Sequence, residues 1–194
     1  MNPTAAASAW TAQVWIEHKS DDPEAVSALE VARGRLAAGS ALRNVRRLRL
    51  IEIHGALPAR ETLSDLLHRS TRFYNPHKER CTLRLAAGDP TPVMLDEQAV
   101  LVTERGGERR NAAERWWLHE TDERVIVREG VVWAMEFAPG TVGAEALAEL
   151  TWARDRAHGL LCNPNSQDGK VANGKPPFPW LTEDSPAVVA GGQP

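Results

Sequence analysis

Short stretches in which apolar and polar residues alternate are separated by stretches in which apolar residues recur every three to four positions. The alternating stretches predict strands at Gln13–His18, Val45–His54 and Arg80–Leu85. The longer spacing predicts two helices between them, and the first opens with Asp21 or Asp22 as a cap and Pro23 in its first turn. The first half of the chain therefore has the predicted order β-α-β-α-β.

The second half repeats this order less regularly. Strands are predicted at Ala99–Thr103, Arg124–Arg128 and Val131–Phe137, with a helix at Asn111–Glu120 after the first of them. Apolar residues at helical spacing then predict a long helix over Ala144–Leu161. No last strand is evident after this helix, because the rest of the chain is rich in Gly, Pro, Asn and Ser, a composition typical of a flexible tail.

The middle strand of the first half carries apolar residues on both of its faces. Leu48 and Leu50 point one way, and Ile51 and Ile53 point the other. A strand of this kind is normally covered on both sides. Helices of the same half can cover one side, and we expect the other half or another subunit to close the second.

Turn-forming residues divide the chain at Gly88–Pro92, between the two halves. We expect an α+β protein built from two ferredoxin-like strand-and-helix units, with helices packed on antiparallel sheets. The predicted organisation is a flexible lead-in over residues 1–11, a first unit over 12–87, a linker over 88–97, a second, divergent unit over 98–165 and a flexible tail over 166–194.

An Asn-Pro dipeptide follows the last predicted helix of each unit, at Asn75-Pro76 and at Asn163-Pro164. Asparagine tolerates the left-handed conformation at a helix end, and proline cannot continue a helix. Any helix end could carry this dipeptide. The shared order of strand, turn, helix and Asn-Pro is the stronger signal, and it predicts an internal duplication.

Composition and charge limit the classes of partner. The 194 residues carry a net charge of −3 and are 42% hydrophobic, which is ordinary for a globular chain and gives no general attraction to nucleic acid or to an anionic membrane. The two cysteines form no CxxC pair, the first nine residues do not resemble a secretory signal, and no apolar run approaches the about 20 residues that cross a bilayer. We therefore expect a cytoplasmic protein that does not enter membranes.

Positive charge is concentrated in one short stretch, which contains Arg43, Arg46, Arg47 and Arg49. Charges of this kind can line a solvated strand edge, where they discourage pairing with another sheet. They can also form a patch that receives an acidic partner or a phosphate group. The sequence leaves both interpretations open.

No catalytic, cofactor-binding or metal-binding constellation can be assembled from the sequence. The six histidines include no HExxH pair, and Gly106-Gly107 lacks the context of a phosphate-binding loop. Cys81 lies on the apolar face of an alternating strand, and Cys162 lies at a predicted helix C-terminus, where a thiolate is destabilised. We expect the chain to perform no chemistry of its own, and a small enzyme that uses one of these cysteines is an alternative.

Several short motifs together suggest a known family. They are Gln13–Lys19, Asp22-Pro23, Val45–Ile53, Asn75-Pro76 and Cys81–Leu85 in the first half, and Val125–Phe137 and Leu160–Pro164 in the second. In this order they resemble the small PurS subunit of phosphoribosylformylglycinamidine synthase, an amidotransferase of purine biosynthesis. The resemblance spans residues 12–165, and the Gly-Lys pair typical of the family's middle strand is absent here.

The resemblance implies an accessory, non-catalytic subunit that bridges the synthetase and glutaminase subunits of an ATP-dependent amidotransferase and needs no cofactor. Two copies in one chain would resemble a fused form of that family's dimer, and self-association is a further expectation. An alternative is an RNA- or regulatory-binding module with a ferredoxin-like sheet, for which the basic stretch would be the footprint. The candidate interaction residues are Arg46, Arg47, Arg49, Asn75, Pro76, Asn163 and Pro164.

Overall fold

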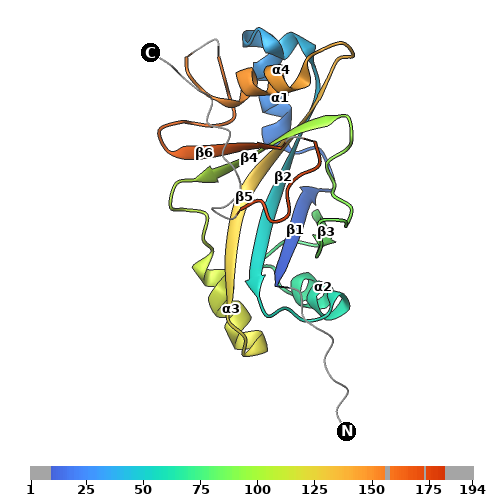
Figure 1. Ribbon diagram of the computed structural model, residues 1–194, viewed down its shortest axis with the longest axis vertical. Coiled ribbons are helices and arrows are strands. Elements are labelled where there is room, and N and C mark those ends of the chain that lie inside the picture. The colour runs from blue at the N-terminus through green and yellow to red at the C-terminus, as the bar shows by residue number, and fades with distance from the viewer. Residues whose placement is uncertain (1–9, 156–157, 173, 182–194) are drawn as a thin grey trace.

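The computed structural model describes residues 10–155, 158–172 and 174–181 of the chain. These residues form an α+β fold in which one six-stranded antiparallel sheet carries four α-helices (Figure 1). The elements are β1 (Thr11–His18), α1 (Pro23–Arg35), a 3₁₀ turn (Ala38–Ala41), β2 (Leu42–Gly55), α2 (Arg60–Arg69), β3 (Glu79–Arg84), β4 (Glu97–Glu104), α3 (Asn111–Thr121), β5 (Val125–Phe137), α4 (Gly143–Thr151) and β6 (Gln167–Ala172).

The strands run in the order β3-β1-β2-β5-β4-β6, and every pairing is antiparallel. Each half of the chain therefore contributes three adjacent strands, with its first strand in the middle of its three. The halves meet along the two longest strands, β2 and β5, which pair from Leu42↔Phe137 to Gly55↔Val125. Both halves have the element order β-α-β-α-β, and the long central ladder joins them into one sheet.

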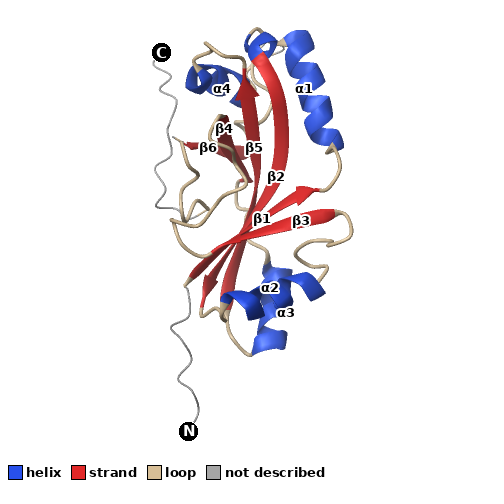
Figure 2. Ribbon diagram, turned by 90° about the vertical axis from the view of Figure 1, so that its right-hand side faces the viewer, coloured by secondary structure: helices blue, strands red, loops and turns tan. Residues whose placement is uncertain are grey.

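The helices lie on one face of the twisted sheet, here called the helical face. Val45, Ile51 and Ile53 of β2 point to it, since strand residues two positions apart share a face. Helices α2 and α3 cover one end of this face and α1 and α4 cover the other (Figure 2). The first helix of each half therefore packs beside the second helix of the other half, which interlocks the two halves.

A segment of the same chain covers much of the opposite face of the sheet. Residues 174–181, here called the strap, follow β6 and cross this opposite face, which is here called the strap face. Trp180 and Leu181 of the strap are 1% and 4% exposed, and they pack with Val93 on Leu50 and Val132 of the central strands. We expected the other half or another subunit to close the second face of β2. Within the described residues, segments predicted as tail and linker cover it, and the strap belongs to the second half of the chain.

The predicted boundaries need two further corrections. The flexible tail predicted over 166–194 contains strand β6 and the strap, and residues 182–194 lie outside the described part. The linker predicted over 88–97 contributes Val93 to the core and its last residue, Glu97, to strand β4. Of the lead-in predicted over 1–11, residues 1–9 lie outside the described residues and Thr11 begins β1.

The helix predicted over Ala144–Leu161 ends ten residues early, at Thr151. Trp152 is extended and forms a bridge with Cys162, so the chain after the helix doubles back on itself. Gly159 makes this return possible, because it has a φ of +74° and a Cβ at this position would lie 1.6 Å from the carbonyl oxygen of Trp152.

Candidate functional site

The two Asn-Pro dipeptides lie in turns that lead into the outer strands β3 and β6, and not at the helix ends where they were predicted. In the first turn, the backbone carbonyl of Asn75 accepts hydrogen bonds from the N–H groups of Lys78 and Glu79 at 3.0 and 2.8 Å. The Asn75 side chain accepts from the N–H of His77 at 3.0 Å, and its own N–H donates to the Glu79 carboxylate at 2.6 Å.

The second turn repeats these bonds one for one. The Asn163 carbonyl accepts from the N–H groups of Ser166 and Gln167 at 3.1 and 2.8 Å. Its side chain accepts from the N–H of Asn165 at 3.0 Å, and its N–H donates to the Gln167 side chain at 2.8 Å. Asn163 and Pro164 are exposed, and their counterparts in the first half are partly exposed. Each half thus presents the same turn beside its outer strand.

Arg46 lies on the strap face and is held by its own chain. Its guanidinium donates to both carboxylate oxygens of Glu97, at 2.8 and 2.7 Å. It also donates to Glu17 at 3.0 Å and to the carbonyl of Pro92 at 2.6 Å. The hydrogen bond to Glu97 raises the pKa of Arg46. All these contacts tie β2 to β1 and to the segment that precedes β4.

Arg47 and Arg49 point to the helical face, between the two helix pairs. Arg47 lies 3.0 Å from the Glu24 carboxylate at the start of α1. Arg49 donates to Glu129 of β5 at 2.8 Å, and Arg110 at the start of α3 also contacts that carboxylate. The three candidate arginines therefore do not form one patch, and intramolecular carboxylates neutralise each of them. This arrangement supports a structural role for the basic stretch over a surface that receives phosphate. The expected solvated strand edge is wrong, because β2 is a central strand that pairs with β1 and β5.

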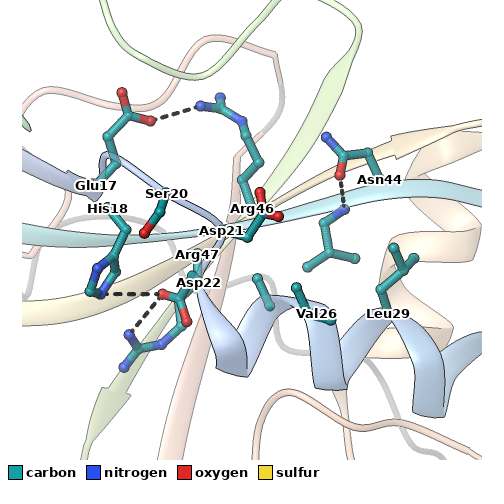
Figure 3. A pocket seen from close by; sticks show the side chains of 12 residues that line it. Glu17, His18, Ser20, Asp21, Asp22, Val26, Leu29, Asn44, Arg46 and Arg47 are labelled. Carbon is teal, nitrogen blue, oxygen red and sulfur yellow. Dashed lines mark hydrogen bonds and ion pairs between the residues drawn. The ribbon is translucent and has the colours of Figure 1, made fainter. Parts of the chain in front are cut away.

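A pocket of about 230 Å³ lies beside the N-terminus of α1 and includes Arg46 and Arg47 in its wall (Figure 3). Asp22 accepts a hydrogen bond from the Glu24 N–H at 2.8 Å, as the sequence predicts for the cap of this helix. The same carboxylate lies 3.4 Å from Arg47 and 3.9 Å from His18. The Asp22 carboxylate is thus engaged in capping α1 and in an ion pair with Arg47 of β2.

The two thiols are poor nucleophiles at neutral pH. Burial raises the pKa of Cys81 and of Cys162 to about 11. A thiol with this pKa is almost entirely protonated near pH 7, and only the thiolate attacks. Within the residues that the structure describes, no group of three or more His, Cys, Asp or Glu side chains is arranged to hold a metal ion.

A row of buried polar side chains on the strap face was not predicted from the sequence. Gln13, Glu52 and Arg84 come from β1, β2 and β3 and are 0%, 0% and 1% exposed. Gln13 donates to Glu52 at 2.8 Å and accepts from Arg84 at 3.0 Å, so the three form a chain of hydrogen bonds. The available signal was at Glu52, which shares a strand face with Leu48 and Leu50, whereas Arg84 falls on the polar side of the predicted alternation.

This polar row holds the strap. Arg84 donates to the carbonyls of Pro176 and Pro177 at 2.8 and 3.3 Å, and Gln13 donates to the latter at 2.8 Å. The strap residues at the other end of the row bind Glu52. Its carboxylate accepts from the backbone N–H groups of Trp180 and Leu181 at 2.5 and 3.0 Å.

The segment that follows β3 crosses the strap face in a similar way. Arg46 of β2 donates to the carbonyl of Pro92 in this segment, and Arg128 of β5 donates to the carbonyl of Leu181 in the strap at 3.2 Å. Val93 and Leu181 both pack in the core of this face. The two segments thus meet on the strap face, where the strap of the second half is bound mainly by side chains of β1, β2 and β3 in the first half.

No helix in the described ranges is both long and apolar enough to cross a membrane. Comparisons with protein-family models, with curated proteins and with solved structures found no match to this chain.

Proposed function

We propose that this protein is an accessory, non-catalytic component of a purine-biosynthetic amidotransferase, in which it bridges the synthetase and the glutaminase. One observation carries the proposal. Two halves with the same order of elements are joined through β2 and β5 and carry matching Asn-Pro turns. This is the arrangement expected of two PurS-like, ferredoxin-like units fused into one chain, as the sequence resemblance implies.

The geometry suits a bridging role. The central ladder and the interlocked helix pairs join the halves in a single sheet, so the two turns are held in a fixed relation. A body with two similar outward-facing turns can hold two proteins in a defined orientation. Neighbouring exposed residues differ between the turns, with His77 and Lys78 in one and Asn165 and Ser166 in the other, which would allow the turns to bind different partners.

The available chemistry also fits an accessory role. Both thiols are held protonated, and the three candidate arginines are paired with carboxylates of the chain itself. These groups stabilise the fold and are not free to act on a substrate.

The test is reconstitution of the amidotransferase from its separate subunits. Glutamine-dependent synthesis should rise by about tenfold or more when the full chain is added to the synthetase and the glutaminase, and the three should co-elute. Synthesis from free ammonia should not change, because ammonia bypasses the glutaminase. If the two catalytic subunits reach full glutamine-dependent activity without the chain, the proposal is wrong.

Asn163→Ala and Asn75→Ala variants of the full chain extend the test. Each should weaken co-elution with one catalytic subunit more than with the other, if the two turns serve different partners. Arg80→Ser is the matched control, since this exposed side chain lies outside both turns.

A further inference from the structure

The polar row on the strap face recognises one kind of peptide. Arg84 offers only N–H donors, and the residues opposite it are Pro176 and Pro177, whose carbonyls accept while their nitrogens have no proton to donate. Glu52 offers only acceptors, and it meets the consecutive N–H groups of Trp180 and Leu181. Donors and acceptors are therefore separated along the row in the order that a Pro-Pro-x-x-Trp-Leu segment requires.

Apolar and aromatic contacts add to this recognition. The Trp180 ring lies 6.2 Å from that of Trp15, and the guanidinium of Arg84 lies over the Phe178 ring at 5.2 Å. Lys175 donates to the carbonyl of Ala87 at 2.9 Å. The strap is thus contacted at both ends and in its middle. The site formed by the polar row and the residues around it is here called the strap groove.

The strap is bound as a ligand would be. It is not one of the six strands, and the hydrogen bonds described above attach it through the side chains of Gln13, Glu52, Arg84 and Arg128. At its start, Gly174 has a φ of +82°, and no atom lies near the position of a Cβ. The positive φ is one that glycine adopts more readily than other residues.

We infer that the strap groove is a peptide-binding site that accepts residues 174–181 of a second copy of the chain as well as its own. An exchanged strap makes the same contacts as the resident one, so exchange between two copies costs little contact energy. The resident strap competes at an effective concentration on the order of millimolar, so it occupies the groove in dilute solution. This inference does not depend on the proposed function.

The test uses a fluorescent peptide with the sequence of residues 174–181 and two forms of the full chain. Trp180→Ala weakens the resident strap and leaves the groove intact, so this variant should bind the peptide at least about tenfold more tightly than the wild-type chain, by fluorescence polarisation. A peptide with Trp180→Ala should bind neither form. In light scattering, the wild-type chain should form dimers as its concentration rises toward millimolar, and the variant should form fewer.

Each other result counts against the inference. A folded Trp180→Ala chain that does not bind the peptide shows that the groove accepts no ligand in trans. Peptide binding without dimers of the wild-type chain excludes a second copy as the occupant. If the variant does not fold, hydrogen exchange of the wild-type chain decides: the Trp180 and Leu181 amides should exchange faster than those of β2, and exchange only through global unfolding would make the strap a permanent part of the core.

Discussion

Residues 152–162 either continue helix α4 or turn back toward it, and these two descriptions predict opposite effects of Gly159→Ala on the free energy of unfolding. If these residues continued helix α4, as the sequence predicts, Gly159→Ala would stabilise the protein by about 0.5–1 kcal/mol. In the structure, Gly159 has a φ of +74° and faces the backbone of Trp152. The substitution should therefore be strongly destabilising.

The magnitude follows from two costs. A left-handed conformation costs a residue other than glycine about 1–2 kcal/mol. The added Cβ would lie 1.6 Å from the carbonyl oxygen of Trp152, far inside the ordinary contact distance of about 3.5 Å, so the two segments must separate. Separation weakens the bonds between Cys162 and Thr151 at 2.8 Å and between Ala153 and Cys162 at 2.9 Å, each worth about 1 kcal/mol. The expected loss is about 2–4 kcal/mol of the free energy of unfolding.

Urea unfolding followed by tryptophan fluorescence measures this loss, and the Tm should fall by roughly 5–15 °C. Gly34→Ala is the matched control, since Gly34 lies inside α1 and nothing is within 4 Å of an added Cβ. The control should be stabilised by up to about 1 kcal/mol. Equal stabilisation of both variants would refute the reasoning and favour a continuous helix.

The remaining predictions concern the ion pairs, the thiols and the turns. Arg46→Ser removes the two-point contact with the buried Glu97 carboxylate and should lower the free energy of unfolding in urea by about 1–3 kcal/mol, whereas a loss near zero would show that the pair is not formed. Burial raises the pKa of Cys81 from 9.0 to about 11, so the folded state favours the neutral thiol. The free energy of unfolding should therefore be unaffected by this group below pH 9 and should fall as the pH rises toward 11. Urea titrations at several pH values measure this fall. Alkylation of both cysteines at pH 8 should be much slower in the folded chain than in urea, and equal rates would contradict the pKa shift. Asn75→Ala and Asn163→Ala should each cost about 0.5–1.5 kcal/mol, and thermal melts that differ widely between them would argue against equivalent turns.

The structure changes the basis on which the chain can associate with partners. The apolar residues on both faces of the central strands predicted a second face closed by the other half of the chain or by another subunit. Leu50 and Ile53 are both 0% exposed, because helices cover one face and the strap and Val93 help to cover the other. Both faces of the central strands are thus covered within the described residues, and the exposed turns are the surface on which the proposed role rests.

The candidate residues differ in how far the sequence could place them. The repeated Asn-Pro turns were visible because they depend on a few neighbouring residues, although their position before β3 and β6 was not. The roles of Arg46 and Arg49 were not predictable, since their partners Glu97 and Glu129 lie 51 and 80 residues further along the chain. The buried polar row was not predictable for the same reason. The N–H groups that Glu52 binds belong to strap residues more than 120 positions further along the chain.

The sequence by itself determined the elements whose signals are local. Alternation within β1 and β2, helical spacing in α2 and an aspartate cap before Pro23 depend on residues a few positions apart. The structure has each of them, with Asp22 as the cap. Strand β6 was hidden, because it is short and mostly polar and its Gly169 packs under the Trp152 ring. Only the tertiary structure decided that residues 167–172 form strand β6 and that the chain returns after α4. It also decided the place of the strap and the partners of the arginines. These features exist because segments far apart in the chain meet, and a buried charge is stable only when a distant segment supplies the matching group.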